Sequence, residues 1–132
     1  MNHSAETTFE VNSRVEDEYD AREGARRLTR AREVRVYEGA LEGEGTAEYL
    51  MMYREDGSAS FVGLERIEGT LGDRTGSFVL QHIGTHEDGV ARETLSVIAG
   101  SGTAQLLGLI GGGVFESGET EKYAMTLHYD YE

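Results

Sequence analysis

Residues 57–84 constrain the fold more than any other part of the chain. β-Branched and aromatic residues gather in two runs, around Val62–Ile67 and Phe78–Ile83, with a glycine-punctuated stretch between them. Such runs between glycine-rich breaks are typical of β-strands and of the turns that join them. We therefore expect an antiparallel hairpin, whose most unusual polar side chains are Glu65 and the pair Gln81–His82.

The rest of the chain repeats this pattern of short alternating segments. Asp56–Gly57 and Asp88–Gly89 are dipeptides that favour tight hairpin turns. Residues 14–25 are charged and without a steady period, so we expect a loop there, and residues 39–45 should form a turn region. The six further strands are expected at residues 5–13, 28–37, 46–54, 90–98, 104–115 (bent at three glycines) and 122–131.

About eight strands with hairpin connections favour an all-β fold, an eight-stranded antiparallel closed β-barrel, because closure pairs every strand edge. A β-sandwich is the alternative. The chain has 132 residues and no linker-like segment, so residues 1–132 should form a single β-barrel domain. Glycine, at 18 residues, is suited to the bends that such a barrel needs.

Composition excludes several classes of function. With no cysteine there can be no thiolate metal site and no cysteine nucleophile, and a cysteine-free chain suits the cytoplasm. The N-terminus lacks signal-peptide features, and no apolar run approaches the roughly 20 residues of a membrane-spanning helix, so we expect no membrane partner. A net charge of −13 disfavours binding to nucleic acid.

Six arginines lie within residues 22–35. They could form an anion-binding or interface patch. We favour the simpler interpretation, a surface strand whose arginines neutralise the surrounding carboxylates.

Glu65 is the first candidate for chemistry. Alternation places it on the same face as Phe61, Gly63 and Ile67. If that face is the barrel interior, loss of water would favour the neutral carboxyl, which could act as an acid or base or hydrogen-bond a carbonyl. The alternative is an ion pair between Glu65 and an arginine across a sheet or interface.

Gln81 and His82 point to opposite faces of one strand, so only one of them can line an interior pocket. Both faces are apolar, so the pattern does not choose between them. His82 is the second catalytic candidate, although a histidine on such a face is more often a satisfied core residue. Apolar residues on both faces also predict a covered outer face, and hence a homo-oligomer. His82 and His86 would lie about 13 Å apart along a strand, so we expect no metal site.

Tyrosine and methionine side chains provide a candidate ligand-binding wall. Both residue types adapt to planar apolar ligands that carry a few polar groups. Ordinary barrel core is the alternative interpretation. The candidate ligand-binding residues are Tyr49, Met51, Tyr53, Phe61, Phe78, Gln81 and Tyr123.

Several short motifs resemble a bacterial family of unknown function whose members look like allene-oxide-cyclase-type barrels. The motifs are Tyr49–Tyr53, Gly63–Arg66, Gly69–Gly72, Arg74–His82 and Gly100–Thr103 with Leu107–Leu109. The resemblance covers nearly the whole chain and implies an eight-stranded, often oligomeric barrel, but no activity. Enzymes of that barrel class include plant allene oxide cyclases and bacterial polyketide cyclases, which need no cofactor. Where the family tends to carry an aromatic residue, this chain has Arg14–Val15, which puts closure of one barrel mouth in doubt.

The resulting hypothesis is a barrel that binds a small apolar molecule without a cofactor. It leaves open whether the protein is an enzyme. A cyclase or isomerase would hold a lipid- or polyketide-like substrate in a reactive shape while Glu65 and His82 or a tyrosine polarise one oxygen. The alternatives are a non-catalytic ligand carrier and a structural oligomeric barrel.

Overall fold

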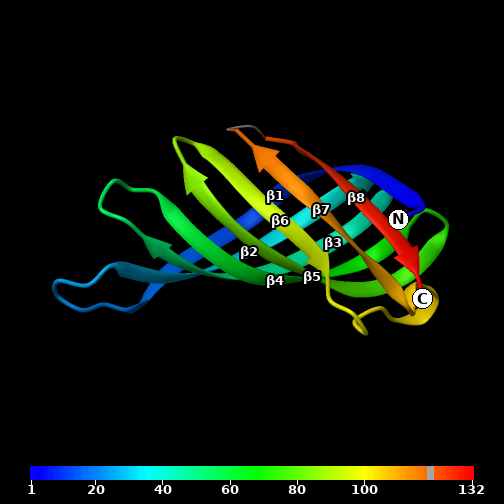
Figure 1. Ribbon diagram of the computed structural model, residues 1–132, viewed down its shortest axis with the longest axis horizontal. Helices are drawn as coiled ribbons and strands as arrows, with labels where there is room; N and C mark the ends of the chain where they lie inside the picture. Colours follow the sequence, from blue (N-terminus) through cyan, green and yellow to red (C-terminus); the bar gives the residue numbers. More distant parts are fainter. Residues whose placement is uncertain (119–120) are drawn as a thin grey trace.

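The computed structural model describes residues 1–118 and 121–132, and within them the chain forms eight strands and one short 3₁₀ helix. Each strand pairs antiparallel with its neighbour in sequence, and β8 pairs with β1 to close the barrel (Figure 1). The predicted closed barrel is therefore confirmed, and the sandwich is excluded. The elements are β1 (His3–Asp20), β2 (Arg27–Gly39), β3 (Leu41–Tyr53), β4 (Ala59–Leu71), β5 (Arg74–Glu87), β6 (Val90–Val97), η1 (Ala104–Leu106), β7 (Leu109–Ser117) and β8 (Tyr123–Tyr131).

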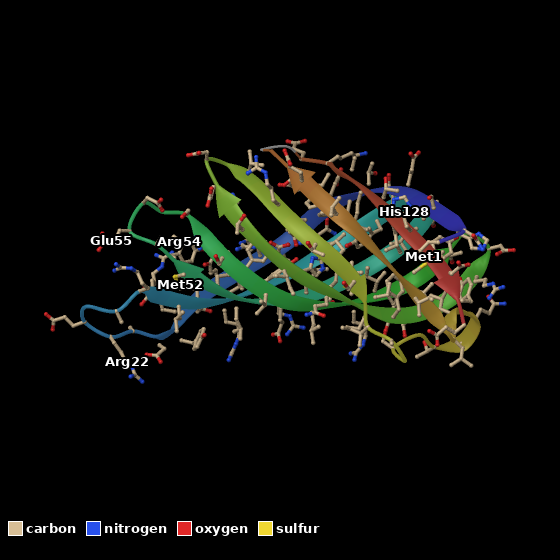
Figure 2. The ribbon with its side chains drawn as sticks, viewed as in Figure 1. Met1, Arg22, Met52, Arg54, Glu55 and His128 are labelled. Carbon is tan, nitrogen blue, oxygen red and sulfur yellow. The ribbon has the colours of Figure 1, made fainter. Side chains whose placement is uncertain are left out.

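The barrel has two distinct ends. The β2–β3 and β4–β5 turns, the connection through η1 and both chain termini lie at one end, which we call the closed end (Figure 1). The β1–β2, β3–β4 and β5–β6 turns lie at the opposite end, which we call the mouth (Figure 1). Figure 2 shows Met1 and His128 at the closed end, and Arg22, Arg54 and Glu55 at the mouth.

Alternation along the strands fills the closed end with apolar side chains. Every second residue points inward, as in Phe78 and Leu80 of β5, while the residues between them face out. η1 packs beside the first half of β5 and puts Leu106 into the same core. Each fully buried side chain of this size stabilises the fold by about 1.5–3 kcal/mol relative to an exposed one. The core includes Leu41, Ile67, Leu71, Phe78, Leu80, Leu106, Leu109 and Leu127.

The prediction of a loop at residues 14–25 was wrong for most of its length, because β1 continues to Asp20. Val11 pairs with Arg35 and Ser13 pairs with Val34, so Asn12 is an extra residue in β1. Such a bulge exchanges the two faces of the strand beyond it. Arg14 and Glu16 therefore point into the barrel, and their apparent lack of period reflects the bulge.

Residues 39–45 were also misassigned, since β2 ends at Gly39 and β3 begins at Leu41, so that only Ala40 separates them. Gly43 instead lies inside β3, opposite Gly69 of β4. A Cβ on Gly43 would lie 2.1 Å from the carbonyl oxygen of Glu68. This glycine permits close strand packing rather than a turn. Similarly, the predicted bent strand at 104–115 divides into η1 and β7.

Candidate functional site

A buried histidine lies between two carboxylates in the middle of the barrel. Alternation brings Glu65 of β4, His82 of β5 and Glu93 of β6 to the interior face of adjacent strands. His82 Nε2 is 2.8 Å from Glu65 Oε1, and His82 Nδ1 is 2.8 Å from Glu93 Oε1. Burial lowers the pKa of His82, but the hydrogen bonds to both carboxylates outweigh it and the net pKa is raised. Carboxylate oxygens facing both ring nitrogens thus favour the imidazolium form.

Glu65 has its predicted place in the interior, where its side chain is fully buried. The Tyr37 hydroxyl donates to Oε2 at 2.6 Å, and Arg35 Nη1 lies 3.5 Å from Oε1. Burial raises the pKa of Glu65, but the hydrogen bond from His82 and the charge of Arg35 lower it by more than burial raises it, so the net pKa is lowered. The expected neutral carboxyl is thus wrong. Glu65 is a carboxylate held by three partners.

Two glycines make room for this cluster. A Cβ on Gly45 of β3 would lie 2.0 Å from Glu65 Oε2. A Cβ on Gly63 of β4 would lie 2.5 Å from Cδ1 of Tyr49. Both distances are shorter than any normal contact, so the glycines are a condition for placing the Glu65 carboxylate and the Tyr49 ring where they are.

Arg35 joins the buried cluster to the mouth. Its Nη2 lies 2.9 Å from Glu33 Oε1 and also donates to the Tyr49 hydroxyl. The guanidinium lies 4.6 Å from the centre of the Phe9 ring, in a cation–π contact. Arg35 therefore bridges two carboxylates, Glu33 and Glu65, and fixes the ring of Tyr49.

At the mouth, Arg14 is held by two carboxylates. It forms ion pairs with Glu33 and, at 3.0 Å, with Glu16. Glu16 also accepts hydrogen bonds from the Thr29 hydroxyl at 2.6 Å and from the Tyr53 hydroxyl. Burial raises the pKa of Glu16, but these hydrogen bonds and Arg14 outweigh it, so its net pKa is lowered. Arg14 thus lies at the mouth.

A cavity of about 420 Å³ lies between this mouth and the buried cluster. Its size falls within the roughly 300–1,000 Å³ of small-molecule sites. The polar or charged side chains on its wall include Arg14, Glu33, His86 and Glu93. The aromatic and methionine side chains on the wall are Phe9, Tyr49, Met51, Tyr53, Phe61, Phe115 and Tyr123.

Five of the seven predicted ligand-binding residues come together on this wall: Tyr49, Met51, Tyr53, Phe61 and Tyr123. Phe78 instead belongs to the closed-end core. Gln81 lies on the outer face, because His82 occupies the interior face of β5 and neighbours alternate. Placing Gln81 and Phe78 with the cavity residues was therefore wrong. Glu65 and His82 lie below the cavity wall rather than on it.

Sequence reasoning missed Glu33, Arg35 and Glu93. Strand alternation would have found them, because every second residue of a strand shares a face. Glu33 and Arg35 share a face with the buried Ala31 and Tyr37, and Glu93 shares one with Leu95. Arg14 offered no such signal, because the bulge precedes it.

The remaining arginines of the basic segment lie outside the barrel. Exposed pairs join Arg22 to Asp20 at 2.9 Å, Arg26 to Glu55 at 3.2 Å and Arg32 to Glu48 at 3.9 Å. These pairs fit the interpretation of a neutralised surface strand, and Arg35 is the exception.

The outer face of β3, β4 and β5 carries exposed apolar side chains. Leu50, Val62, Leu64 and Ile83 are between 45% and 54% exposed. Leu50, Val62 and Leu64 line an open groove of about 800 Å³, whose wall also includes Glu44, Arg66 and Glu68. An apolar surface with charged flanks is typical of an interaction site.

Across residues 1–118 and 121–132, no three His, Asp or Glu side chains are arranged to hold a metal ion. Over the same residues, no helix is long and apolar enough to cross a bilayer.

Comparison with known proteins gives a family without a described activity. Residues 5–129 match the family model described as "Protein of unknown function (DUF3224)". A crystal structure of a DUF3224 protein with unknown function from Shewanella oneidensis MR-1 is similar over 98% of both chains, with 30% identity and a TM-score of 0.83. No curated protein matches. Neither match concerns allene oxide cyclases, so that likeness stays a prediction.

Proposed function

We propose, for a chain that belongs to the DUF3224 family of proteins of unknown function, that the mouth cavity binds a small, largely apolar molecule. The supporting observation is an aromatic-walled cavity that ends on a buried cluster of ion pairs. Aromatic walls contribute apolar contact area, and the fixed polar groups below them would orient one polar group of the ligand. The cysteine-free composition is compatible with the cytoplasm, and that location belongs to the same proposal.

The ion pairs explain how such a cavity would stay open. Charged side chains lose much of their hydration inside a barrel, and they remain there only where partners compensate for that loss. Arg35 and His82 each contact two carboxylates, so their positions are restricted. They would therefore act as a rigid floor, whereas an apolar floor could repack to fill the space.

A cofactor-free cyclase or isomerase acting on a lipid- or polyketide-like substrate is the catalytic form of this proposal. The supporting observation is Glu93, which lies on the cavity wall and also bonds to His82. In that form the barrel holds the substrate in a reactive shape, Glu93 moves the proton, and His82 and Glu65 position Glu93. A carrier would use the same cavity without turnover.

Native mass spectrometry of the purified protein tests ligand binding. We expect a retained small molecule, or binding of the neutral dye Nile red with increased fluorescence. Ala91→Phe places a ring at the cavity wall and should abolish both signals. Val114→Phe, on an exposed outward position of β7, is the matched control and should leave them unchanged. Absence of both signals from the wild-type protein would contradict the proposal.

We also propose that the outer face of β3–β5 pairs with a second copy of the chain. Leu50, Val62 and Leu64 would meet their own counterparts across a two-fold axis. Arg66 has no ion-pair partner among the described residues, and the same groove carries Glu44 and Glu68. A two-fold contact can place Arg66 of one copy against a glutamate of the other, so the surface is complementary to itself in charge.

Sedimentation equilibrium tests this pairing. The wild-type chain should sediment as a dimer or higher oligomer, and Leu64→Glu should convert it to a monomer. Val114→Glu introduces the same charge on another exposed apolar position and should leave the mass unchanged. A monomeric wild type would remove the pairing and leave the cavity proposal intact.

A further inference from the structure

We infer that the ligand of the mouth cavity is a small apolar amine, with its ammonium group held by Glu93. The inference rests on the proposed ligand-binding function and names the ligand's chemical class. It depends on one carboxylate oxygen, on the charges around the cavity and on the aromatic rings of its wall.

Glu93 offers the cavity one unused acceptor. Its residue is 8% exposed, and its Oε1 is taken by His82 Nδ1 at 2.8 Å. Oε2 has no hydrogen-bond partner in the part of the chain that the structure describes. Because Glu93 is on the cavity wall, a bound molecule would meet this oxygen. A carboxylate oxygen gains more from a charged donor than from a neutral one, since charge-assisted hydrogen bonds are the stronger kind.

The charged side chains of the mouth and of the buried cluster below the cavity sum to one net negative charge. His82 counts as a cation here because both ring nitrogens bond to carboxylates. A ligand with a single positive charge would neutralise the set, whereas an anion would add a second uncompensated charge at a poorly hydrated site. The four carboxylates are Glu16, Glu33, Glu65 and Glu93, and the three cations are Arg14, Arg35 and His82.

The positive groups near the cavity do not favour an anion. Arg14, on the wall, is bound by Glu16 and Glu33. Arg35 lies against Glu33 and Glu65. His86 is exposed at the rim. The arginine charges are thus already compensated, while the acceptor of Glu93 is not.

Aromatic rings complete a site for a cation. The wall includes the rings of Phe9, Tyr49, Phe61 and Phe115, and ring faces attract ammonium groups. Such a contact already exists inside this barrel, between Arg35 and Phe9. The net charge of −13 also raises the local concentration of cations around the protein.

Three probes that share a ring but differ in charge test the inference: phenethylamine, phenethyl alcohol and phenylacetate. Isothermal titration calorimetry at neutral pH should show phenethylamine binding about tenfold more tightly than the alcohol, as expected for one charge-assisted hydrogen bond. Phenylacetate should bind most weakly. If the alcohol or phenylacetate binds as tightly as the amine, the amine inference is overturned and the cavity proposal stands. If none of the three binds, both fail.

The Glu93→Gln variant tests the assignment to Glu93. It keeps an acceptor for His82 and removes the charge, so the preference for phenethylamine over the alcohol should fall about tenfold. Glu116→Gln is the matched control, because it removes the same charge from an exposed ion pair with Arg92 outside the cavity. It should leave the preference unchanged. A preference that survives in Glu93→Gln, with folding checked by circular dichroism, would overturn the assignment. The wild-type series decides the ligand class even if this variant does not fold.

Discussion

The two halves of the barrel interior are built from the same eight strands but filled in different ways. At the closed end, side chains such as Leu41, Leu71 and Leu109 are at most 1% exposed and pack against one another. Toward the mouth, the same alternating positions carry Glu65, His82 and other charged groups, with a cavity above them. The closed-end half is an ordinary apolar core. The mouth half holds buried ion pairs and a cavity, neither of which is needed to fold a barrel.

This difference suggests that the closed end provides most of the stability and the mouth half provides the function. Apolar packing at the closed end stabilises the barrel through loss of water-exposed surface. Buried ion pairs contribute little net stability, because desolvation offsets much of their attraction. A chain that keeps them in half of its interior gains something other than stability, and we attribute this gain to a preorganised binding site.

The largest expected effect on stability comes from replacing one phenylalanine by alanine in each half of the barrel. Phe78→Ala, in the closed-end core, should lower the free energy of unfolding by about 3–5 kcal/mol. Phe61→Ala, on the cavity wall, should lower it by less, since one side of that ring already faces open space. Urea unfolding followed by circular dichroism measures both. Equal losses would mean that the cavity is filled in solution.

An intermediate effect is expected from closing the space around the cluster. Gly45→Ala should lower the free energy of unfolding by about 1–3 kcal/mol, because the new methyl group overlaps the Glu65 carboxylate. Gly118→Ala, where a Cβ would meet no atom of the described residues within 4 Å, should change it by less than about 0.5 kcal/mol. Thermal unfolding monitors both variants. A neutral Gly45→Ala would show that Glu65 moves freely.

The charge on His82 should make the stability of the mouth half depend on pH. The pKa of His82 is raised above its ordinary 6.5, so its stabilising contribution is fully present below pH 6.5 and is lost as the pH rises through the raised value. The stability difference between wild type and His82→Gln should therefore shrink above pH 6.5, by about 1.4 kcal/mol per unit of the upward shift.

Few charged or titratable groups lie close enough to His82 to alter this pH dependence. The groups that face His82 are Glu65, Glu93 and the Tyr49 ring, and Arg35 acts through Glu65. Burial raises the pKa of Tyr49, so it does not titrate in this range. A difference that stays constant or grows with pH would show that His82 is neutral in the folded protein.

The closed-end half could be predicted from sequence more fully than the mouth half. Apolar alternation and glycine-rich turns indicated the barrel and the interior position of Glu65, because these depend on local periodicity. The partners of Glu65 depend on strand register instead, and register brings Arg35, His82 and Glu93 together from three other strands. Period two likewise could not tell whether Gln81 or His82 faces inward, since both faces of β5 are apolar.

A single extra residue limited the prediction further. Asn12 exchanges the faces of β1, so Arg14 reaches the mouth from a position that simple alternation would assign to the outside. Nothing local distinguishes Asn12 as a bulge. Its effect is visible only when β1 is aligned with β2.

The smallest effect should come from an ion pair on the outside of β2. Arg32→Gln breaks an exposed pair with Glu48 at 3.9 Å, and it should change the free energy of unfolding by less than about 0.5 kcal/mol and still less at high salt. Arg32 also lines the outer groove, which we propose as the contact between two copies of the chain. The small effect on unfolding is therefore expected only at protein concentrations where the chain is a monomer. At protein concentrations where the proposed pair forms, the same substitution acts on an interface, and its effect should grow with concentration. Unfolding measured over a range of protein concentrations would separate the two cases, and a concentration-independent effect would contradict a role for this part of the outer face in pairing.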